Sequence, residues 1–263
     1  MNEISRIIVF DLWSDFAHFR KGYTTTSALT YLIPPKSVIA GMIAGMIGLP
    51  NEKENKQNNY YKSLNPENLK LSVRILNPIK KVVIKENFID TKHGLTHWEI
   101  QRKKQAPRTQ IPIEFIKDPY YRIYVWIGNQ YFEKLKDFLE NHKTFYTPYL
   151  GITECIANFN FKNLFEGFEI NQIETKNGVY EIDSIIPIQA IEGDIVIEKN
   201  VSYSRDNIPL FINEKREAFT YGEFVFNMDG NPINDRKPIK IEGIKENYKK
   251  FGISIGHENV ILF

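Results

Sequence analysis

The chain has 263 residues, of which 42% are apolar, and a formal net charge of +2, so it is long enough to bury a sizeable core. Its single cysteine, Cys155, excludes a disulfide framework, and no cysteine and histidine cluster has the spacing of a zinc site. The longest apolar run, 38–49, is too short to span a bilayer, and no signal peptide opens the chain. We therefore expect a globular cytoplasmic protein without metal, cofactor or membrane contact.

The chain opens with a strand, a loop and a helix. A β-branched and aromatic run at 4–13 predicts a central strand, and a loop that ends in two prolines leads into an apolar helix at 38–48. Because this helix is apolar almost all round, we expect it to be buried, with Gly41 and Gly45 packed tightly on a sheet. Residues 69–88 then predict one long strand, bent at its proline.

Further along, residues 120–127 predict a strand, 130–142 a helix and 152–161 another strand. The order strand, helix, strand, strand, helix, strand is the βαββαβ order of the ferredoxin-like or RRM-like fold, in the α+β class. We assign this domain to residues 1–165. Short strand candidates with Asn-Gly and Asp-Gly turns indicate a β-rich C-terminal portion over 166–263.

A long insertion, at about 88–118, separates two predicted strands of this domain. Insertions of this length in a compact domain are more often functional than connective. The segment 101–110, QRKKQAPRTQ, contains cations and no acid, which favours contact with RNA phosphates over a merely solvated hairpin. Its cations are Arg102, Lys103, Lys104 and Arg108.

Three other stretches offer groups that RNA binding uses. The loop 17–27 holds cations, an aromatic ring and several hydroxyl groups, and RNA contact and an ordinary polar loop explain it equally well. Residues 145–155 place aromatic side chains around a proline and a glycine, for which a helix-to-strand turn with buried tyrosines is the plainer explanation. One face of strand 120–127 is aromatic, and it either stacks bases or packs on the C-terminal portion.

Three segments within residues 4–161 carry a family resemblance: SDFAHFRKGYTTTSALTYLIPPKSVIAGMIAGMIGL, QAPRTQIPIEFIKDPYYRIYV and FYTPYLGITECIANF. Together they resemble the Cas-five family of CRISPR-associated proteins, in the RAMP superfamily, and most of all its subtype I-B branch. The resemblance implies a ferredoxin-like domain with a thumb-like hairpin insertion. It also implies a non-catalytic subunit of a type I surveillance complex (Cascade), acting in antiviral defence.

Such a subunit binds the repeat-derived 5′ handle of the crRNA, caps the filament of backbone subunits and docks the large subunit that inspects target DNA. The helix start near Ser37 also offers unpaired N–H groups that suit a phosphate. The expected RNA contacts on this chain are Arg20, Lys21, Tyr23, Lys36, Ser37, Arg102, Lys103, Lys104, Arg108, Gln110, Tyr149, Leu150 and Gly151.

The main alternative is a metal-independent endoribonuclease that processes precursor crRNA, as in the subtype I-C branch of the same family. That chemistry needs a general base, a general acid and stabilisation of phosphate charge. His93 and His97, close to the basic segment, are the candidates if the chain is a nuclease, although a histidine in a polar loop is usually only hydrogen-bonded. A free-standing RRM-like RNA-binding protein is a third explanation of the same residues.

Overall fold

The structure is a computed structural model that describes residues 4–24, 27–51, 53–56, 59–89, 108–213, 215 and 217–263. Most of its regular structure is β-sheet, with few helices, so the fold belongs to the α+β class that the sequence predicts. In this described part of the chain, no helix is long and apolar enough to cross a membrane.

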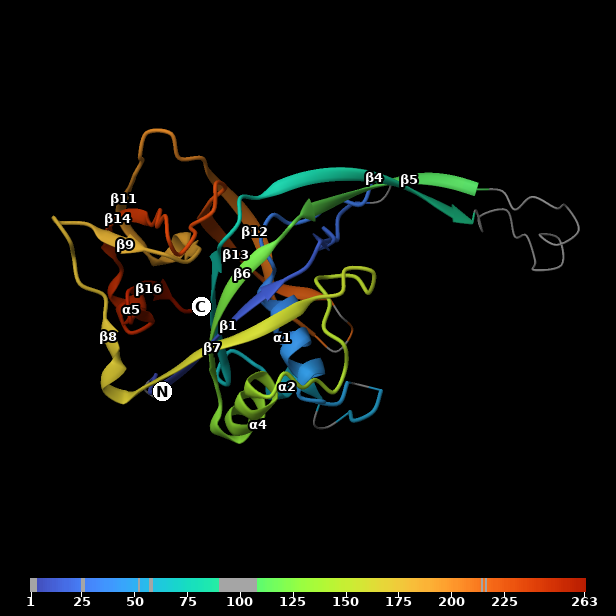
Figure 1. The fold of residues 1–263 in the computed structure, drawn as a ribbon, viewed down its shortest axis with the longest axis horizontal. Helices are drawn as coiled ribbons and strands as arrows, with labels where there is room; N and C mark the ends of the chain where they lie inside the picture. Colours follow the sequence, from blue (N-terminus) through green and yellow to red (C-terminus); the bar gives the residue numbers. More distant parts are fainter. Residues whose placement is uncertain are drawn as a thin grey trace, which may run out of the picture.

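A four-stranded antiparallel sheet forms the centre of the molecule (Figure 1). Its strands follow the order β3-β6-β1-β7. They are β1 (Arg6–Trp13), β3 (Leu69–Ile75), β6 (Tyr120–Ile127) and β7 (Asn158–Glu166). The first strand pairs with a neighbour on each side, as its nearly unbroken apolar sequence predicts for a central strand.

Helices α1 (Lys36–Met46) and α4 (Asn129–Glu140) cover one face of this sheet (Figure 1). The core beneath them joins Phe10 of β1, Ile43 of α1 and Leu135 of α4, all of them fully buried. The single turn α2 (Tyr60–Ser63) packs beside α1 through the ring of Tyr60. Both predicted helices are therefore confirmed, with small shifts of their ends.

Strands of the C-terminal portion cover the other face. Because side chains alternate along a strand, Ile7 and Val9 point away from the helices, and they pack with Ile253 and Val260. The elements of this portion are β8 (Ile170–Gln172), β9 (Tyr180–Ile182), β10 (Ile186–Pro187), β11 (Ile191–Val196), β12 (Tyr203–Ile212), β13 (Ala218–Asn227), β14 (Ile239–Ile244), α5 (Glu246–Lys249), β15 (Gly252–Ile255) and β16 (Glu258–Ile261). They form three small sheets, β10-β13-β12, β11-β14-β9 and β16-β15-β8.

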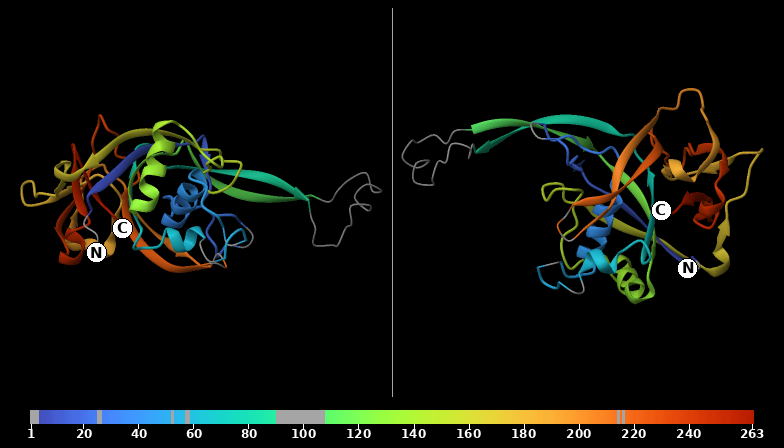
Figure 2. Two further views of the ribbon diagram at one scale, coloured as in Figure 1. Left: turned by 90° about the horizontal axis from the view of Figure 1, so that it is seen from below. Right: turned by 180° about the vertical axis from the view of Figure 1, so that it is seen from behind.

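A two-stranded ribbon projects from the body of the molecule (Figures 1 and 2). It consists of β4 (Lys80–Ile89) and β5 (Arg108–Lys117), which pair antiparallel along their whole described length. At its base, the short β2 (Phe16–Ala17) adds to the free edge of β5. The ribbon begins before residue 88, where the sequence places the start of the insertion, and its tip lies outside the described residues.

The prediction of one bent strand over 69–88 is wrong, because β3 and β4 belong to different sheets. Pro78 lies at the break, where it cannot donate a ladder hydrogen bond. The C-terminal portion holds the chain on both sides of the break, since Ile79 N–H donates to Met228 O at 2.8 Å and Asn231 N–H donates to Ile75 O at 2.7 Å.

The predicted strand at 152–161 is wrong in its first half. Before β7 the chain forms a turn, in which Leu150 N–H donates to Cys155 O at 2.8 Å and Cys155 N–H donates to Ile152 O at 3.0 Å. Strict alternation of apolar and polar residues holds only over 157–161, at the start of β7, whereas 152–156 does not alternate and forms the turn.

Candidate functional site

A groove of about 500 Å³ lies between α1 and the segment that follows α4. Side chains and backbone of α1 form its floor, the turn at 146–151 forms one wall, and Tyr60 and Ile212 contribute to the remaining lining. The volume falls in the range of sites that hold small molecules. None of its twelve lining residues, all from the described part of the chain, is a lysine, arginine, aspartate or glutamate.

Main-chain hydrogen bonds tie the wall of the groove to the end of α1. Phe145 N–H donates to Met46 O at 2.8 Å, and Tyr146 N–H donates to Gly45 O at 3.2 Å. Carbonyl groups in the last turn of a helix have no partner within the helix, so these bonds satisfy them. The Phe145 ring covers Gly48, where φ is +68° and a Cβ would lie 2.8 Å from the ring. Wall and floor therefore form one connected unit.

Gly151 joins this wall to the loop 17–27. Its φ is +93°, and a Cβ at this position would collide with the main-chain oxygen of His18. His18 N–H also donates to Leu150 O at 3.1 Å. Only glycine fits such a close approach of two backbones. The structure thus brings together two stretches that the sequence singled out separately, with Tyr149 exposed and Leu150 buried.

Gly41 and Gly45 line the groove and are not packed on the sheet, so that prediction is wrong. A Cβ on Gly41 would lie 3.7 Å from the Tyr60 hydroxyl oxygen, and a Cβ on Gly45 would lie 4.0 Å from Tyr146 Cβ. Both are ordinary van der Waals distances, and neither glycine has a positive φ. Glycine inside a helix costs about 1 kcal/mol relative to alanine. Neither tight packing nor backbone conformation therefore requires glycine at these two positions.

The ribbon has two chemically different faces, which its register fixes, since Ile84 lies opposite Ile113 and Asn87 lies opposite Gln110. One face carries most of the apolar side chains, namely Val82, Ile84, Phe88, Ile111, Ile113 and Phe115. The opposite face carries most of the polar ones, namely Lys81, Lys85, Asn87, Arg108, Gln110 and Glu114. Together the two strands contain five cations and two acids, so the described ribbon is positively charged.

Two of the predicted ribbon contacts, Arg108 and Gln110, are exposed on β5. The other residues predicted for this insertion lie outside the described residues. They are Arg102, Lys103 and Lys104, together with the candidate nuclease residues His93 and His97.

Lys36 lies in the interior and not on the surface where a phosphate contact was expected. Its side chain is buried, its Nζ donates to Phe263 O at 2.6 Å, and the Phe211 ring centroid is 4.6 Å away. Burial lowers the pKa of Lys36 to about 7. Lys21 is also engaged, since its Nζ lies 3.2 Å from Asp206 Oδ1.

The remaining residues predicted near the start of α1 have different positions. Arg20 is exposed, and the Tyr23 ring is 72% exposed. Ser37 lines the groove, and its Oγ donates to Pro209 O at 3.4 Å. The structure therefore groups Ser37 with Tyr149 and Gly151 around the groove, and leaves Arg20 and Tyr23 on an exposed loop.

The aromatic face of β6 is closed by the C-terminal portion, so packing is the correct one of the two explanations. Tyr124 is fully buried and Trp126 is nearly so, and both join a core cluster with Ile255 and Leu262. The rings of Tyr124 and Trp126 are therefore not available for a base to stack on.

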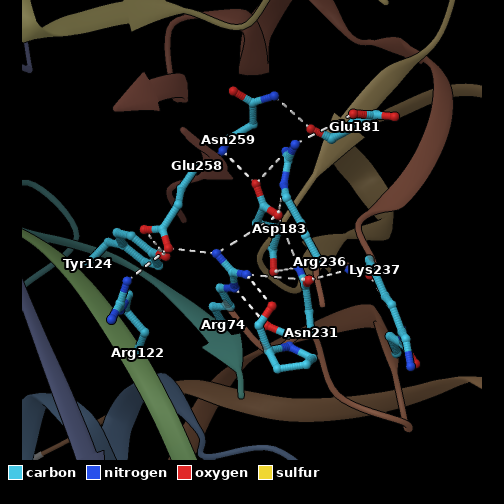
Figure 3. A network of polar contacts seen from close by, with 12 residues as sticks. Arg74, Arg122, Tyr124, Glu181, Asp183, Asn231, Arg236, Lys237, Glu258 and Asn259 are labelled. Atoms are coloured by element: carbon cyan, nitrogen blue, oxygen red, sulfur yellow. Dashed lines mark hydrogen bonds and ion pairs between the residues drawn. The ribbon is translucent and has the colours of Figure 1, made fainter. Parts of the chain in front are cut away.

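Buried ion pairs hold this closure in place (Figure 3). Glu258 of β16 receives hydrogen bonds from Arg74 at 2.6 Å, from Arg122 at 2.8 Å and from the Tyr124 hydroxyl at 2.8 Å. Arg74 and Arg122 lie directly opposite each other on β3 and β6, so the carboxylate offsets their mutual repulsion. Burial and the neighbouring Glu258 raise the pKa of Tyr124 well above its usual value.

The described histidines offer no acid–base pair at the groove, since none of them is among its lining residues. His18 is buried with its Nδ1 2.7 Å from Glu114 O, and burial lowers its pKa. The His142 ring stacks on Phe159 with 4.4 Å between centroids. Among the residues that the structure describes, no group of three or more histidine, cysteine, aspartate or glutamate side chains could hold a metal ion.

Sequence reasoning missed two parts of this surface. Tyr60 lies in the polar segment 51–63, which the sequence predicts to be an exposed loop without an assigned function, and the Tyr60-Tyr61 pair in it is the only available signal. The cations Lys81 and Lys85 fall in the run 69–88, for which the sequence predicts one long strand bent at its proline. They are four residues apart, which places them on one face of a strand, so their spacing could have indicated the charged face of a ribbon.

The described part of the chain thus forms a sheet-rich α+β domain with a projecting positive ribbon and an uncharged groove. The family described as CRISPR-associated protein (Cas_Cas5) matches residues 7–201. Because this match covers most of the chain, the protein belongs to the Cas5 family, as its resemblance predicts. A search of the curated proteins found no match.

Two solved structures are similar to this chain. A CRISPR protein from Archaeoglobus fulgidus is 12% identical, with 98% of each chain covered and a TM-score of 0.52. At this identity the likeness concerns the fold alone. A chain titled as part of a CRISPR RNA-guided surveillance complex is 13% identical, with 88% of this chain and 95% of that chain covered and a TM-score of 0.49.

Proposed function

We propose that this protein is a non-catalytic RNA-binding subunit of a type I CRISPR surveillance complex, of the subtype I-B kind, that acts in the cytoplasm in antiviral defence. It binds the repeat-derived 5′ handle of the crRNA and caps the filament of backbone subunits. The large subunit docks on it, and target DNA is met only through the assembled complex. The observation that carries this proposal is the positively charged ribbon on a member of the Cas5 family.

The order of elements supports a ferredoxin-like core with the ribbon as its thumb. Strands β1, β3, β6 and β7 alternate with α1 and α4 in the order strand, helix, strand, strand, helix, strand, and the ribbon is inserted between β3 and β6. In the sheet β1 and β6 occupy the middle, and the other two strands occupy the edges. This is the arrangement expected of two split βαβ units that form one antiparallel sheet.

The two faces of the ribbon suit two kinds of partner. Exposed Lys85 and Arg108 can neutralise RNA phosphates, which positions a strand without reading its sequence. On the other face, Phe88 is 44% exposed in the free protein. A contact with another subunit would bury this ring, and burial of an exposed aromatic ring favours binding. We assign the cationic face to crRNA and the apolar face to the neighbouring backbone subunit.

The groove chemistry supports binding over cleavage. Metal-independent RNA cleavage needs a proton acceptor and a proton donor within hydrogen-bond reach of the reacting atoms. The groove lining holds tyrosines but no histidine, lysine, arginine or carboxylate, and a phenol is a poor general base at neutral pH.

The test is to incubate the full chain with labelled precursor repeat RNA in EDTA and to follow binding and cleavage together. We expect binding of the RNA that carries the handle sequence at its 5′ end, with no cut product. A discrete cut without metal would overturn the non-catalytic assignment, and substitution of His93 and His97 would then show whether they perform it. Absence of binding at low salt would overturn the RNA-binding assignment.

A further inference from the structure

We infer that the groove on α1 holds one unstacked nucleobase of the bound RNA. The inference rests on the proposed function, because it requires RNA to reach this side of the molecule. The inference specifies which part of the RNA enters the groove: a neutral planar base and not a phosphate.

The charges around the groove exclude a phosphate as its occupant. Transfer of an anion into a site without a cation carries a large desolvation cost. The lining contains no lysine or arginine, and Lys36, at the start of α1, directs its ammonium to Phe263 in the interior. The described cations of the ribbon are elsewhere, so backbone and base are recognised by different parts of the molecule.

The aromatic lining matches the face of a base. Tyr60, Tyr146 and Tyr149 contribute three rings, and Tyr146 and Tyr149 are 53% and 43% exposed, so their faces are accessible. Proteins that bind single-stranded RNA stack unpaired bases on such rings. The main chain of Tyr146 is bonded to α1, and its ring packs edge-on against Phe145 with 4.9 Å between centroids, so the position of the ring is restricted.

The floor of the groove leaves room for a flat ring. At Gly41 and Gly45 the side chains are absent, although an added Cβ would make only ordinary contacts. Gly41 and Gly45 both lower the stability of α1, and no contact within the protein requires glycine at either position. A base lying across them would explain both glycines, since larger side chains would occupy the space that the ring needs.

The hydroxyl groups of the lining favour a base over an apolar side chain from a partner protein. Tyr146, Thr147 and Tyr149 place hydroxyls around the groove. The edge of a base carries donors and acceptors that can pair with them, whereas an apolar side chain would offer them no hydrogen bond.

The experiment combines two perturbations of the same contact. In the RNA, a single abasic nucleotide is moved along the handle, one position at a time. In the full-length protein, Gly45→Leu fills the groove with a side chain that helices accept, and Gly45→Ala is the matched control that adds only a methyl group. Thermal unfolding checks that both variants fold, and affinity is measured for every protein and RNA pair.

We expect one abasic position to weaken binding to the wild-type protein by about tenfold, the usual scale for loss of one stacked base. Gly45→Leu should bind intact RNA about tenfold more weakly, with an unchanged salt slope, and should no longer distinguish the abasic RNA. A 2-aminopurine at that position should change its fluorescence on binding the wild type but not Gly45→Leu.

Other results overturn the inference in distinguishable ways. If the wild type binds RNA but no abasic position matters, or if Gly45→Leu binds as the wild type does, the groove takes no base and the proposed function survives. If Gly45→Leu keeps RNA affinity but loses assembly with the backbone subunit, the occupant is a protein side chain. If the wild type binds no RNA, the proposed function itself fails and the inference falls with it.

Discussion

Arginine has opposite surroundings at the central sheet and at the ribbon. Arg74 and Arg122 lie beneath the C-terminal strands, share Glu258 and are largely withdrawn from water. Arg108 lies on a two-stranded ribbon with its side chain exposed. The comparison teaches that the partner of a cation, and not the cation itself, decides whether it stabilises the fold or is available to RNA.

The largest effect should follow from removal of the carboxylate that the two buried arginines share. Glu258→Gln leaves both guanidinium groups with a buried partner that carries no charge, although Asp11 and Asp183 still lie near them. We expect the free energy of unfolding to fall by about 3 kcal/mol, measured by urea denaturation. The control is Glu246→Gln, whose carboxylate pairs with Lys249 on the surface and whose loss should have no measurable effect. Equal stability of the two variants would contradict this account.

The junction between groove wall and loop should be the next most sensitive site. Gly151→Ala adds a Cβ against the His18 backbone at a positive φ, and we expect it to lower the free energy of unfolding by about 2–3 kcal/mol. Gly22→Ala is the matched control, because a Cβ there meets nothing within 4 Å. A Gly151→Ala protein as stable as the Gly22→Ala control would mean that the two segments separate without cost.

Lys36 sharpens the comparison, because it is a buried cation without a carboxylate partner among its described contacts. Its pKa is about 7 in the folded protein and near 10.4 when unfolded, so the unfolded chain binds more protons between these values. Stability should therefore rise with pH in this window, by about 2 kcal/mol between pH 7 and pH 9. Subtraction of the same curve for Lys36→Met isolates this rise. A flat difference curve would show that the ammonium is not destabilised by burial.

The smallest effect is expected at the exposed cation. Arg108→Ala should weaken RNA binding only a few-fold, and should make the plot of log affinity against log salt shallower by about 0.7, as for the loss of one phosphate contact with a single strand. Protein stability should not change. Lys249→Ala, on α5 at the opposite side of the molecule, is the control and should leave the salt slope intact. An unchanged slope for Arg108→Ala would remove this residue from the interface.

The core elements were predictable from sequence because they rest on local patterns. Periodicity of apolar residues predicts the first strand, the strand at Tyr120–Ile127 and the two helices. All four are found close to their predicted ranges. The division of the 69–88 run into two strands was not predictable from local sequence. The break between them is held by hydrogen bonds with Met228 and Asn231, which lie far along the chain.

Only part of the site was predictable from the sequence, because the rest depends on contacts between residues far apart in the chain. The proline and glycine in 145–155 indicated a turn and Ser37 indicated the start of a helix, and these residues do meet around the groove. Lys36 looked like a phosphate ligand, but its ammonium is turned inward by contacts with Phe211 and Phe263, which lie some two hundred residues away. The charge of a side chain can be read from the sequence, whereas its direction depends on such distant contacts.

The thin construction of the ribbon implies a gradient of backbone protection. Near its base, β5 has neighbours on both edges, namely β4 and the segment that contains Phe16 and Ala28. Toward Arg108 only one partner strand remains, and an isolated pair of strands is marginally stable in water. Amide hydrogens should therefore exchange slowly beside Phe115 and quickly beside Thr109. When a partner binds the ribbon, the boundary between slow and fast exchange should move from Phe115 toward Thr109. Exchange rates along β5 would therefore measure how much of the ribbon is bound.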